Sequence, residues 1–595
     1  MTKRALLGAG AALVLAVAVA YVPALKAGFV WNDDTYLTEN RTLDGIEGLR
    51  LIWTDPKANE QYYPMVFSSF WVEKRLWSLQ PFGYHLVNVL LHAGSALLLW
   101  WLLVRLGLPG APFAAALFAL HSLSVESVAW IAERKNTLSL LLSLLSIHAW
   151  YSFLEARAKA AEPKNERKKR RRAAPATGPW WRTPAVFYAL SLACLTLALF
   201  AKTTACVVPA VLLVLAWWKK GRMESSDVRP LLPLFAVGAA LALETAWLER
   251  TMVQAAGREW EIGAAARMVL AGQTTLFYAG KLFFPEKLAF MYERWTVDPR
   301  DLRQWLPAAT VLALVAAAWL LRRRIGRGPL AGLLLFLGVL VPAMGFFNVY
   351  AMRFSWVADH FAYQAVAVFA ACIACGLASW IAPLGIAPRR IAAALGLALL
   401  AVLAWRTNAQ SRSYRDEETL WRDTLARSPS CFMCETNYGN WLMEKGRDAE
   451  AVPHFEKSLS LKPENVPALL NLARIADQGG RLDAATSHLR AALRIAPQDT
   501  TVLVNLAAAC TKSGRTDEAI ASYEEALRLG ASGSPVAQNG FGAALMQRGR
   551  AAEAIEHFRE ALRLDPDYAY ARANLERALS VPRGPGPLAP PPSGR

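Results

Sequence analysis

Long apolar stretches alternate with short polar or basic segments along residues 1–408. Each stretch is close to the roughly 20 residues that a helix needs to cross a bilayer, so the pattern predicts a polytopic membrane protein. We expect about eleven spans, near residues 5–25, 82–104, 111–123, 137–153, 184–200, 204–218, 230–248, 306–321, 329–347, 361–381 and 391–405. Residues 267–284 are ambiguous. We interpret them as a re-entrant or interfacial helix, because the basic cluster Arg322–Arg324 requires residues 306–321 to run inward.

The first apolar stretch, residues 5–25, has two interpretations. Ala18–Ala20 would satisfy a signal peptidase, so a cleaved signal peptide is one of them. We favour an uncleaved anchor, because the apolar run is longer than a usual signal-peptide core and more spans follow. Lys3 and Arg4 then hold the N-terminus in the cytoplasm, and the segment Trp31–Asn40 emerges on the outer face.

A different periodicity begins after residue 408. Equivalent residues recur every 34 or 35 positions in four sets: Asn437, Asn471, Asn505, Gly540 and Asn574; Gly446, Gly480, Gly514 and Gly549; Ala451, Ala485, Ala519 and Ala554; Leu459, Leu493, Leu527 and Leu562. This period resembles the tetratricopeptide repeat, in which the glycine ends one helix and the alanine lets two helices approach. Leu425 and Pro429 fit the same register, so we expect the array to begin almost at the membrane.

The two patterns together predict an all-α protein with two domains. Residues 1–408 are expected to form the transmembrane domain, with a cytoplasmic basic loop at 155–182. Residues 409–580 are expected to form an α-solenoid of tetratricopeptide repeats. Residues 581–595 are rich in proline and glycine and are expected to be a disordered tail.

Composition and charge agree with a membrane protein. Of the 595 residues, 54% are hydrophobic, and the mean hydropathy is +0.23. The net charge of +18 is concentrated in clusters that end apolar spans, such as Lys168–Arg172, Lys219–Arg222 and Arg322–Arg324. Positive-inside orientation explains these clusters more simply than nucleic-acid binding does, so we expect a bilayer and no nucleic acid as partner.

The seven cysteines do not form a disulfide framework. Cys431 and Cys434 form one CxxC pair at the start of the repeats, which does not support a four-cysteine zinc site. A local disulfide between them remains open. The sequence contains no phosphate loop, dinucleotide fingerprint, zinc motif or nucleophile elbow.

Two adjacent carboxylates, Asp33 and Asp34, stand where the chain leaves the first span. They could be helix-capping or solvated acids. Alternatively, an acid at the membrane surface can act as a general base that takes a proton from an acceptor hydroxyl. The second carboxylate would then orient the first or bind the acceptor. Two adjacent acids could also hold a divalent metal, although nothing in the sequence requires one.

A second polar segment runs from His121 to Asn136. Glu126, Trp130 and Glu133 fall at i, i+4 and i+7, so a helix would place them on one face, with Arg134 and Lys135 beside it. This could be a charged helix end between two spans. The alternative is a phosphate site, because cations stabilise the charge that develops on a phosphate leaving group.

The remaining candidates also stand at the ends of apolar helices: Lys202, Arg353, Asp359, His360 and Tyr363. Lys202 could simply extend to the membrane surface. The group around His360 could be a helix cap or a second phosphate clamp.

Four segments carry a resemblance to a known family: Trp31–Asn40, Tyr62–Pro64, Pro81–His92 and Val125–Lys135. They resemble bacterial relatives of the transmembrane and tetratricopeptide-repeat O-mannosyltransferases of the C-type glycosyltransferase superfamily. The resemblance implies a C-type glycosyltransferase fold for residues 1–408. It also implies transfer of a sugar, typically mannose, from a polyprenyl-phosphate donor to Ser/Thr hydroxyls of exported proteins.

The family's site residues can be carried over to matching positions of this sequence. Asp33 or Asp34 would be the general base, and the donor-phosphate candidates would be Arg134, Lys135, Lys202 and His360. The chain has Ala358-Asp359-His360-Phe361 where many relatives have Ala-Asp-Arg-Tyr, so a cation is kept there only when the histidine is protonated. No cofactor or metal is required by this chemistry.

Three functions therefore remain open. The first is a protein O-mannosyltransferase of the bacterial inner membrane, whose repeats lie on the periplasmic face and bind the acceptor protein. The second is a glycosyltransferase that acts on an envelope lipid or polysaccharide. The third is a non-catalytic membrane scaffold for protein–protein interaction.

Overall fold

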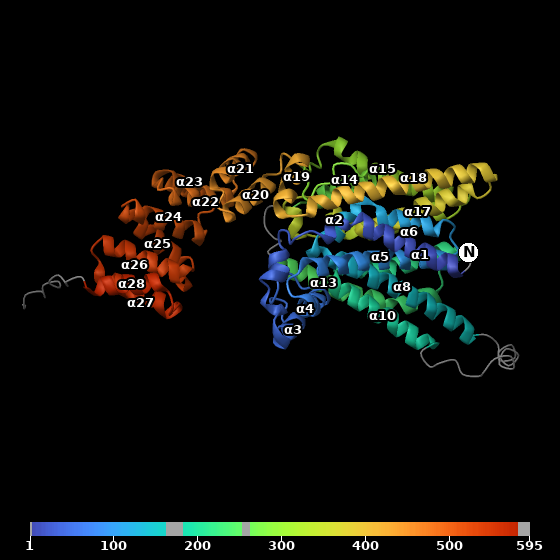
Figure 1. Ribbon diagram of the computed structural model, residues 1–595, viewed down its shortest axis with the longest axis horizontal. Coiled ribbons are helices and arrows are strands. Elements are labelled where there is room, and N and C mark those ends of the chain that lie inside the picture. Colours follow the sequence, from blue (N-terminus) through green and yellow to red (C-terminus); the bar gives the residue numbers. More distant parts are fainter. Residues whose placement is uncertain (1–2, 162–181, 253–261, 581–595) are drawn as a thin grey trace, which may run out of the picture. The chain divides into compact units, whose positions relative to one another are not determined.

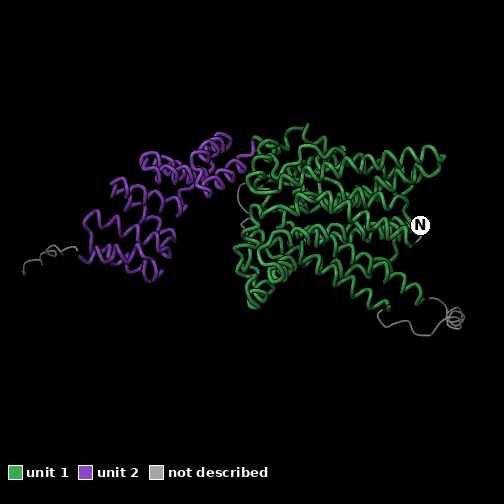
Figure 2. The backbone as a smooth tube through the Cα atoms, in the orientation of Figure 1, with its two compact units in different colours: residues 1–429 green, residues 430–595 purple. Residues whose placement is uncertain are grey.

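The structure is a computed structural model that describes residues 3–161, 182–252 and 262–580. It divides into two compact units, Met1–Pro429 and Ser430–Arg595 (Figure 2). The described residues are helical and contain no strand, which confirms the predicted all-α class. Most of the predicted basic loop at 155–182 and the whole predicted tail at 581–595 lie outside the described residues.

Unit 1 is a bundle of long apolar helices (Figure 1). Those long and apolar enough to cross a membrane belong to α5 (Pro81–Arg105), α8 (Arg134–Ala161), α10 (Pro184–Ala201), α11 (Val208–Lys220), α13 (Leu232–Thr251), α15 (Leu306–Leu321), α17 (Tyr363–Ile381) and α18 (Ile386–Ser411). A ninth span exists if α6 (Ala111–Leu120) and the segment Ser122–Ala129, bent by 53°, are counted together. Unit 1 is therefore a multi-pass membrane domain.

The other two predicted spans are helical but shorter. They are α1 (Lys3–Ala20), followed by α2 (Val22–Leu25), and α16 (Gly328–Leu340). Tyr21, at the junction of α1 and α2, is fully buried, and its ring packs edge-on against His92 of α5. The first apolar stretch thus packs against α5 through Tyr21, and the uncleaved anchor stays a prediction.

Small polar residues hold α8 and α10 side by side. The Ser146 hydroxyl donates to the Ser191 carbonyl at 2.7 Å, and the Ser139 hydroxyl donates to the Ala198 carbonyl at 3.0 Å. Serine side chains are small enough to let two backbones approach, and in a bilayer their hydroxyls need a protein partner. The packing brings the end of α10, where Lys202 lies, to the beginning of α8.

Helix α14 (Ala264–Phe283) is not among the helices that could span a membrane. Near its first end, Arg267 donates to the Gly345 carbonyl at 2.7 Å. Near its other end, the Leu282 carbonyl lies 2.9 Å from His121 Nε2. Both ends of α14 are thus tied to other segments of unit 1.

Unit 2 is a solenoid of helix pairs. Its helices are α20 (Phe432–Glu444), α21 (Asp448–Leu461), α22 (Val466–Gln478), α23 (Leu482–Ile495), α24 (Thr500–Lys512), α25 (Thr516–Arg528), α26 (Pro535–Gln547), α27 (Ala551–Leu564) and α28 (Ala569–Ser580). The recurring glycines close the turns inside the pairs with φ of +70° to +81°, a region that favours glycine. The recurring alanines are fully buried between helices. Cys431 and Cys434 form a disulfide at the start of α20.

Helix α19 (Glu417–Arg427) changes the expected domain boundary. The predicted repeat domain begins at residue 409, but α19 belongs to unit 1, which ends at Pro429. The reason is Trp421, which is fully buried and packs edge-on against Trp31 and Phe290 of unit 1. The repeat register extends into α19, but its aromatic side chain packs with the membrane domain.

Gly272 lies where α14 packs closely against α15. A Cβ at this position would lie 2.3 Å from the Ala308 backbone nitrogen of α15, whereas a Cβ at Gly280 of the same helix would meet nothing. We expect Gly272→Ala to lower the free energy of unfolding by roughly 1–3 kcal/mol through overpacking. Gly280→Ala should be neutral or stabilising by up to about 1 kcal/mol. Thermal unfolding in detergent measures both, and equal effects would contradict the close approach.

Candidate functional site

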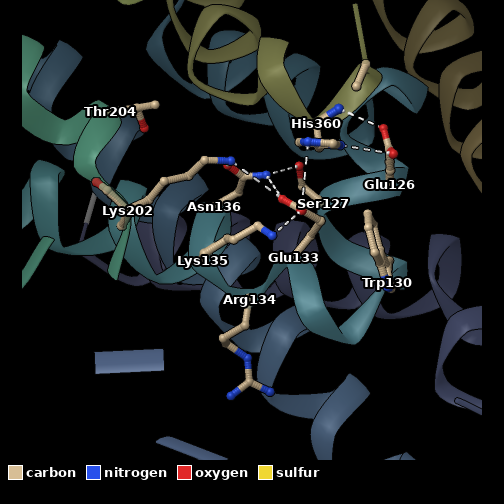
Figure 3. A network of polar contacts seen from close by, with 12 residues as sticks. Glu126, Ser127, Trp130, Glu133, Arg134, Lys135, Asn136, Lys202, Thr204 and His360 are labelled. Atoms are coloured by element: carbon tan, nitrogen blue, oxygen red, sulfur yellow. Dashed lines mark hydrogen bonds and ion pairs between the residues drawn. The ribbon is translucent and has the colours of Figure 1, made fainter. Parts of the chain in front are cut away.

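A cluster of buried ionisable side chains lies where α8 begins (Figure 3). Glu133 is at its centre, with Lys135 Nζ at 2.8 Å and Lys202 Nζ at 3.6 Å from its carboxylate. Lys202 Nζ also donates to Asn136 Oδ1 at 2.8 Å, and Asn136 Nδ2 donates back to Glu133 at 2.5 Å. The side chains of Lys135 and Lys202 are only 9% and 11% exposed. Two ammonium groups this far from water need a counter-ion, and Glu133 supplies it.

His360 joins the cluster from the beginning of α17. Its Nδ1 lies 3.0 Å from Glu126 Oε1, and its backbone N–H donates to Glu126 Oε2 at 2.8 Å. The opposite ring nitrogen, Nε2, lies 3.8 Å from Glu133. Glu126 therefore fixes the imidazole so that its other edge faces Glu133. The structure thus brings together Lys135, Lys202 and His360.

The chain between Glu126 and Glu133 is not one helix, contrary to the sequence prediction. Helix α7 (Val125–Ala129) ends at Trp130, which is extended with φ −87° and ψ +120°, and a short 3-10 helix, Ile131–Glu133, leads into α8. Both glutamates still reach His360, because the break redirects the chain between them. Glu126 and Glu133 are therefore close to each other's partner His360, as the spacing suggested, although they do not lie on one continuous helix.

Arg134 does not point toward this cluster (Figure 3). It is fully buried on the opposite side of α8, where its guanidinium forms an ion pair with Glu73 of α4 (Pro64–Trp77). It also donates to Asn88 Oδ1 and to the Tyr84 carbonyl. In this structure the donors of Arg134 hold α4 and α5 against α8 and lie away from Lys135 and Lys202, and its assignment to the donor phosphate stays a prediction.

Asp33 and Asp34 occupy different environments. Asp33 is fully buried and accepts hydrogen bonds from the backbone N–H groups of Val30 at 3.0 Å and Ala132 at 2.8 Å. Asp34 is exposed, and one of its oxygens accepts from the Thr35 N–H at 2.6 Å. Asp33 thus ties the loop after α2 to the segment that precedes Glu133, whereas Asp34 faces outward.

The loop that carries the acids adjoins the lysines. Tyr36 lies in the turn Asp34–Thr38, and its ring centre is 5.4 Å from Lys135 Nζ. The Tyr36 hydroxyl donates to Gln61 at 2.8 Å. Burial raises the pKa of Glu60, the nearby Asp34 raises it further, and Lys135 lowers it. Glu60 is therefore within electrostatic reach of both the exposed acid and the cluster.

Four other predicted residues do not join the cluster. His121 lies beside it in sequence but contacts the Leu282 carbonyl of α14. Asp359 is buried and accepts a hydrogen bond from the Tyr292 hydroxyl at 2.6 Å. The Tyr363 hydroxyl lies 2.8 Å from His92 Nδ1, inside the helical bundle. Arg353 is exposed, and its guanidinium lies near the Phe354 ring.

Three residues that contact the lysines or Glu133 were not among the candidates predicted from the sequence. Asn136 bridges Lys202, Glu133 and, at 3.1 Å, the Ser127 hydroxyl. Tyr36 and Tyr63 place ring centres 5.4 and 5.7 Å from Lys135 Nζ. Asn136 lies within the segment already singled out and could have been found there. Both tyrosines lie in segments that carry the family resemblance, but they are distant in sequence from Lys135, so their contact with it became visible only in the fold.

Among the residues that the structure describes, no group of three or more His, Cys, Asp or Glu side chains could hold a metal ion. The expectation that the chemistry needs no metal stays a prediction.

Known proteins resemble both parts of the chain. Residues 437–500 and 511–569 match one family model for the tetratricopeptide repeat, and residues 478–538 match another. Human protein O-mannosyl-transferase TMTC1 is 23% identical over 525 residues, which is 79% of this chain. The chain is a relative of the TMTC O-mannosyltransferases.

Further matches to TMTC proteins are shorter. Tmtc1 of Drosophila melanogaster is 32% identical over 140 residues, which cover 22% of this chain and 16% of the relative. Mouse TMTC3 is 28% identical over 155 residues, with coverage of 24% and 16%. The match to human TMTC1 covers 57% of that protein, so the chain spans little more than half of its length.

Solved repeat proteins show a weaker likeness. The tetratricopeptide-repeat protein YrrB is 20% identical, with a TM-score of 0.25, and the match covers 30% of this chain and 89% of YrrB. MamA is 21% identical, with a TM-score of 0.23 and coverage of 26% and 82%.

The buried pair of Arg134 and Glu73 should be essential for stability. Glu73→Gln leaves a buried guanidinium without its counter-ion, which is expected to cost roughly 3–5 kcal/mol of unfolding free energy. Arg134→Gln should cost a similar amount, and the double variant should cost less than the sum. Glu47→Gln, which breaks the exposed pair with Arg50, is the control and should change little. Thermal unfolding in detergent measures all four, and an additive double variant would contradict the pairing.

Asp33 should make stability depend on pH. Burial raises its pKa to about 7, although the hydrogen bonds from Val30 and Ala132 lower it. The folded protein therefore keeps a proton that the unfolded chain releases above about pH 4. Stability from Asp33 is present below that pH and is lost as pH rises to about 7, by at most roughly 1.4 kcal/mol per pH unit.

Asp33→Asn, which does not titrate, is the reference for this effect. As pH rises from about 4 to about 7, the unfolding temperature of the wild type should fall relative to that of this variant. A difference that is constant over this range would show that Asp33 does not titrate there.

Proposed function

We propose that the protein is a membrane glycosyltransferase. It moves a sugar, which we propose is mannose, from a polyprenyl-phosphate donor to Ser/Thr hydroxyls of exported proteins. The observation that carries this proposal is the convergence of Lys135, Lys202 and His360 on one carboxylate, beside a loop that exposes Asp34. The likeness to the TMTC proteins supports it.

The cluster suits a phosphate because its lysines already share one counter-ion. Glu133 contacts Lys135, Lys202 and the edge of His360, so each cation is only partly neutralised. A donor phosphate would add the negative charge that the site lacks. Preorganised cations of this kind stabilise charge that develops on a leaving phosphate, and a poorly hydrated site strengthens the effect. Lys135 and Lys202 would bind the phosphate, and His360 would contribute when protonated.

Asp34 suits the role of general base better than Asp33. Both oxygens of Asp33 accept backbone hydrogen bonds, and the side chain is fully buried, so a substrate hydroxyl does not reach it in this structure. Asp34 is exposed, and one of its oxygens has no such backbone partner among the described residues. A base must come within hydrogen-bond reach of the proton it removes. We therefore assign the base to Asp34 and the positioning of its loop to Asp33.

The reaction then balances without a cofactor. The acceptor hydroxyl oxygen attacks the anomeric carbon, and its proton passes to the Asp34 carboxylate. The bond between the anomeric carbon and the phosphate oxygen breaks, and the electron pair leaves with the polyprenyl phosphate. Lys135 and Lys202 stabilise the charge on the leaving phosphate. One displacement by a single base would invert the anomeric configuration.

Unit 2 would bind the acceptor protein. Stacked repeats form an extended surface that suits peptides or proteins. Asparagines of successive repeats pair along it, since Asn471 donates to Asn440 at 2.6 Å and Asn574 donates to Asn539 at 2.9 Å. We propose a bacterial inner-membrane protein with this site on the periplasmic side, because basic clusters end the spans on the opposite side.

Mass spectrometry of exported proteins tests the proposal. Cells carry the wild type, Asp34→Asn, or Glu39→Gln at matched protein levels. Loss of a general base lowers the rate by roughly 10²–10⁴-fold, so Asp34→Asn should abolish hexose on Ser/Thr. Glu39→Gln changes an exposed carboxylate of the same loop and should leave hexose unchanged.

The other outcomes are equally informative. If exported proteins carry the same hexose in all three strains, the protein-acceptor proposal fails. A simultaneous change in envelope glycolipids would then favour a lipid acceptor. If Asp34→Asn changes neither, a scaffold role would remain.

A further inference from the structure

A charged cavity lies in unit 1, away from the candidate site. It has a volume of about 660 Å³ and is lined by Trp217, Trp218, Gly221, Trp319, Arg322, Arg323, Gly326 and Arg327. These residues come from the end of α11, the end of α15 and the turn that leads into α16. Cavities of several hundred Å³ are the usual size for small ligands. The lining combines three arginines with three tryptophans and contains no carboxylate.

The cavity lies at the opposite end of the bundle from the Glu133 cluster. At the end of α11, Lys219 donates to the Leu106 carbonyl, which follows α5. The neighbouring Arg105 pairs with Glu155 at 3.0 Å, near the end of α8. At 1.5 Å per residue, Glu133 and Glu155 are roughly 30 Å apart along this helix, which is the thickness of the bilayer's hydrocarbon core. The two sites therefore belong to opposite membrane faces.

Two of the three arginines have defined neighbours in the cavity wall. The Arg322 guanidinium lies 4.0 Å from the centre of the Trp319 ring. Arg327 fills the space next to Gly221, whose missing Cβ leaves room for the guanidinium. In the part of the chain that the structure describes, none of the three lining arginines forms an ion pair with a carboxylate. A cavity with positioned guanidinium groups and no acid favours an anion, and the planar fork of arginine matches a phosphate.

The surroundings favour an anion that carries apolar chains. Helix α15 exposes large apolar side chains along its length, including Leu312 at 64% and Leu320 at 75%. Trp319, at the cavity, is itself 50% exposed. Tryptophan at the end of a span is typical of the headgroup level of a bilayer. A ligand whose phosphate enters the cavity could thus lay its chains along α15.

We propose that this cavity binds the phosphate headgroup of an anionic phospholipid at the inner face of the membrane. Arg323 and Arg327 contact the phosphate, Arg322 stays stacked on Trp319, and the acyl chains follow α15. Basic pockets between transmembrane helices on the cytoplasmic side recognise such headgroups by this chemistry. The site is distinct from the proposed donor site, so it does not depend on the proposed function.

Native mass spectrometry of the full-length protein in mild detergent tests the proposal. The protein is titrated with phosphatidylglycerol or phosphatidylcholine, with and without inorganic phosphate. The wild type should retain phosphatidylglycerol in preference to phosphatidylcholine. Arg323→Gln/Arg327→Gln should weaken this retention at least about fivefold, because each arginine near anionic lipid contributes a factor of about that size. Arg323→Lys/Arg327→Lys keeps the charge and should retain most of the binding.

The matched control is Arg324→Gln/Arg390→Gln. It removes the same charge from equally exposed positions that do not line the cavity, and it should weaken retention clearly less than Arg323→Gln/Arg327→Gln does. Equal losses in both glutamine variants, or no headgroup preference in the wild type, would overturn the proposal. Displacement of the lipid by inorganic phosphate at millimolar concentration would show a site for the free anion and would also overturn it. If the glutamine variant unfolds, the headgroup preference of the wild type and the lipid retention of Arg323→Lys/Arg327→Lys still test the proposal.

Discussion

Glu133 is the constraint on which the membrane-domain site depends. Two lysines and a histidine from three separate segments converge on its carboxylate, at 2.8, 3.6 and 3.8 Å. Bringing buried cations together costs desolvation and repulsion, which only a shared anion can offset. The carboxylate therefore keeps α8, the end of α10 and the beginning of α17 in register. A phosphate that enters this site meets cations already in place, so little reorganisation is needed.

The helix break at Trp130 lets the short segment that follows it contact three different parts of unit 1. After the break, Asp33 accepts the Ala132 N–H, which connects the outer loop to the chain. Arg134 then turns to one side of α8 to pair with Glu73, and Lys135 turns to the other side toward Glu133. Neighbouring residues on a helix point about 100° apart, so adjacent cations need not share a role. Adjacent residues thus pair with different partners because their side chains point in different directions.

The charged cavity at the far end of the bundle differs from the Glu133 cluster in how its cations are arranged. Its arginines lie at and just after the end of α15, and they surround an open space rather than a carboxylate. The Glu133 cluster is buried, and its cations share one carboxylate. The cavity is open and positive, as suits contact with an abundant anionic surface.

The sequence by itself determined the all-α class, the apolar spans and the 34-residue repeats, because periodicity and run length depend only on neighbours along the chain. It also pointed to Lys135, Lys202 and His360 through a resemblance. Only the tertiary structure decided that Arg134 pairs with Glu73, that Asp33 is buried while Asp34 is exposed, and that α19 packs with unit 1. Each of these depends on a partner far away in sequence: Glu73 for Arg134, Ala132 for Asp33 and Trp31 for Trp421. Side-chain direction and burial are set by such partners, which a pattern along the chain does not contain.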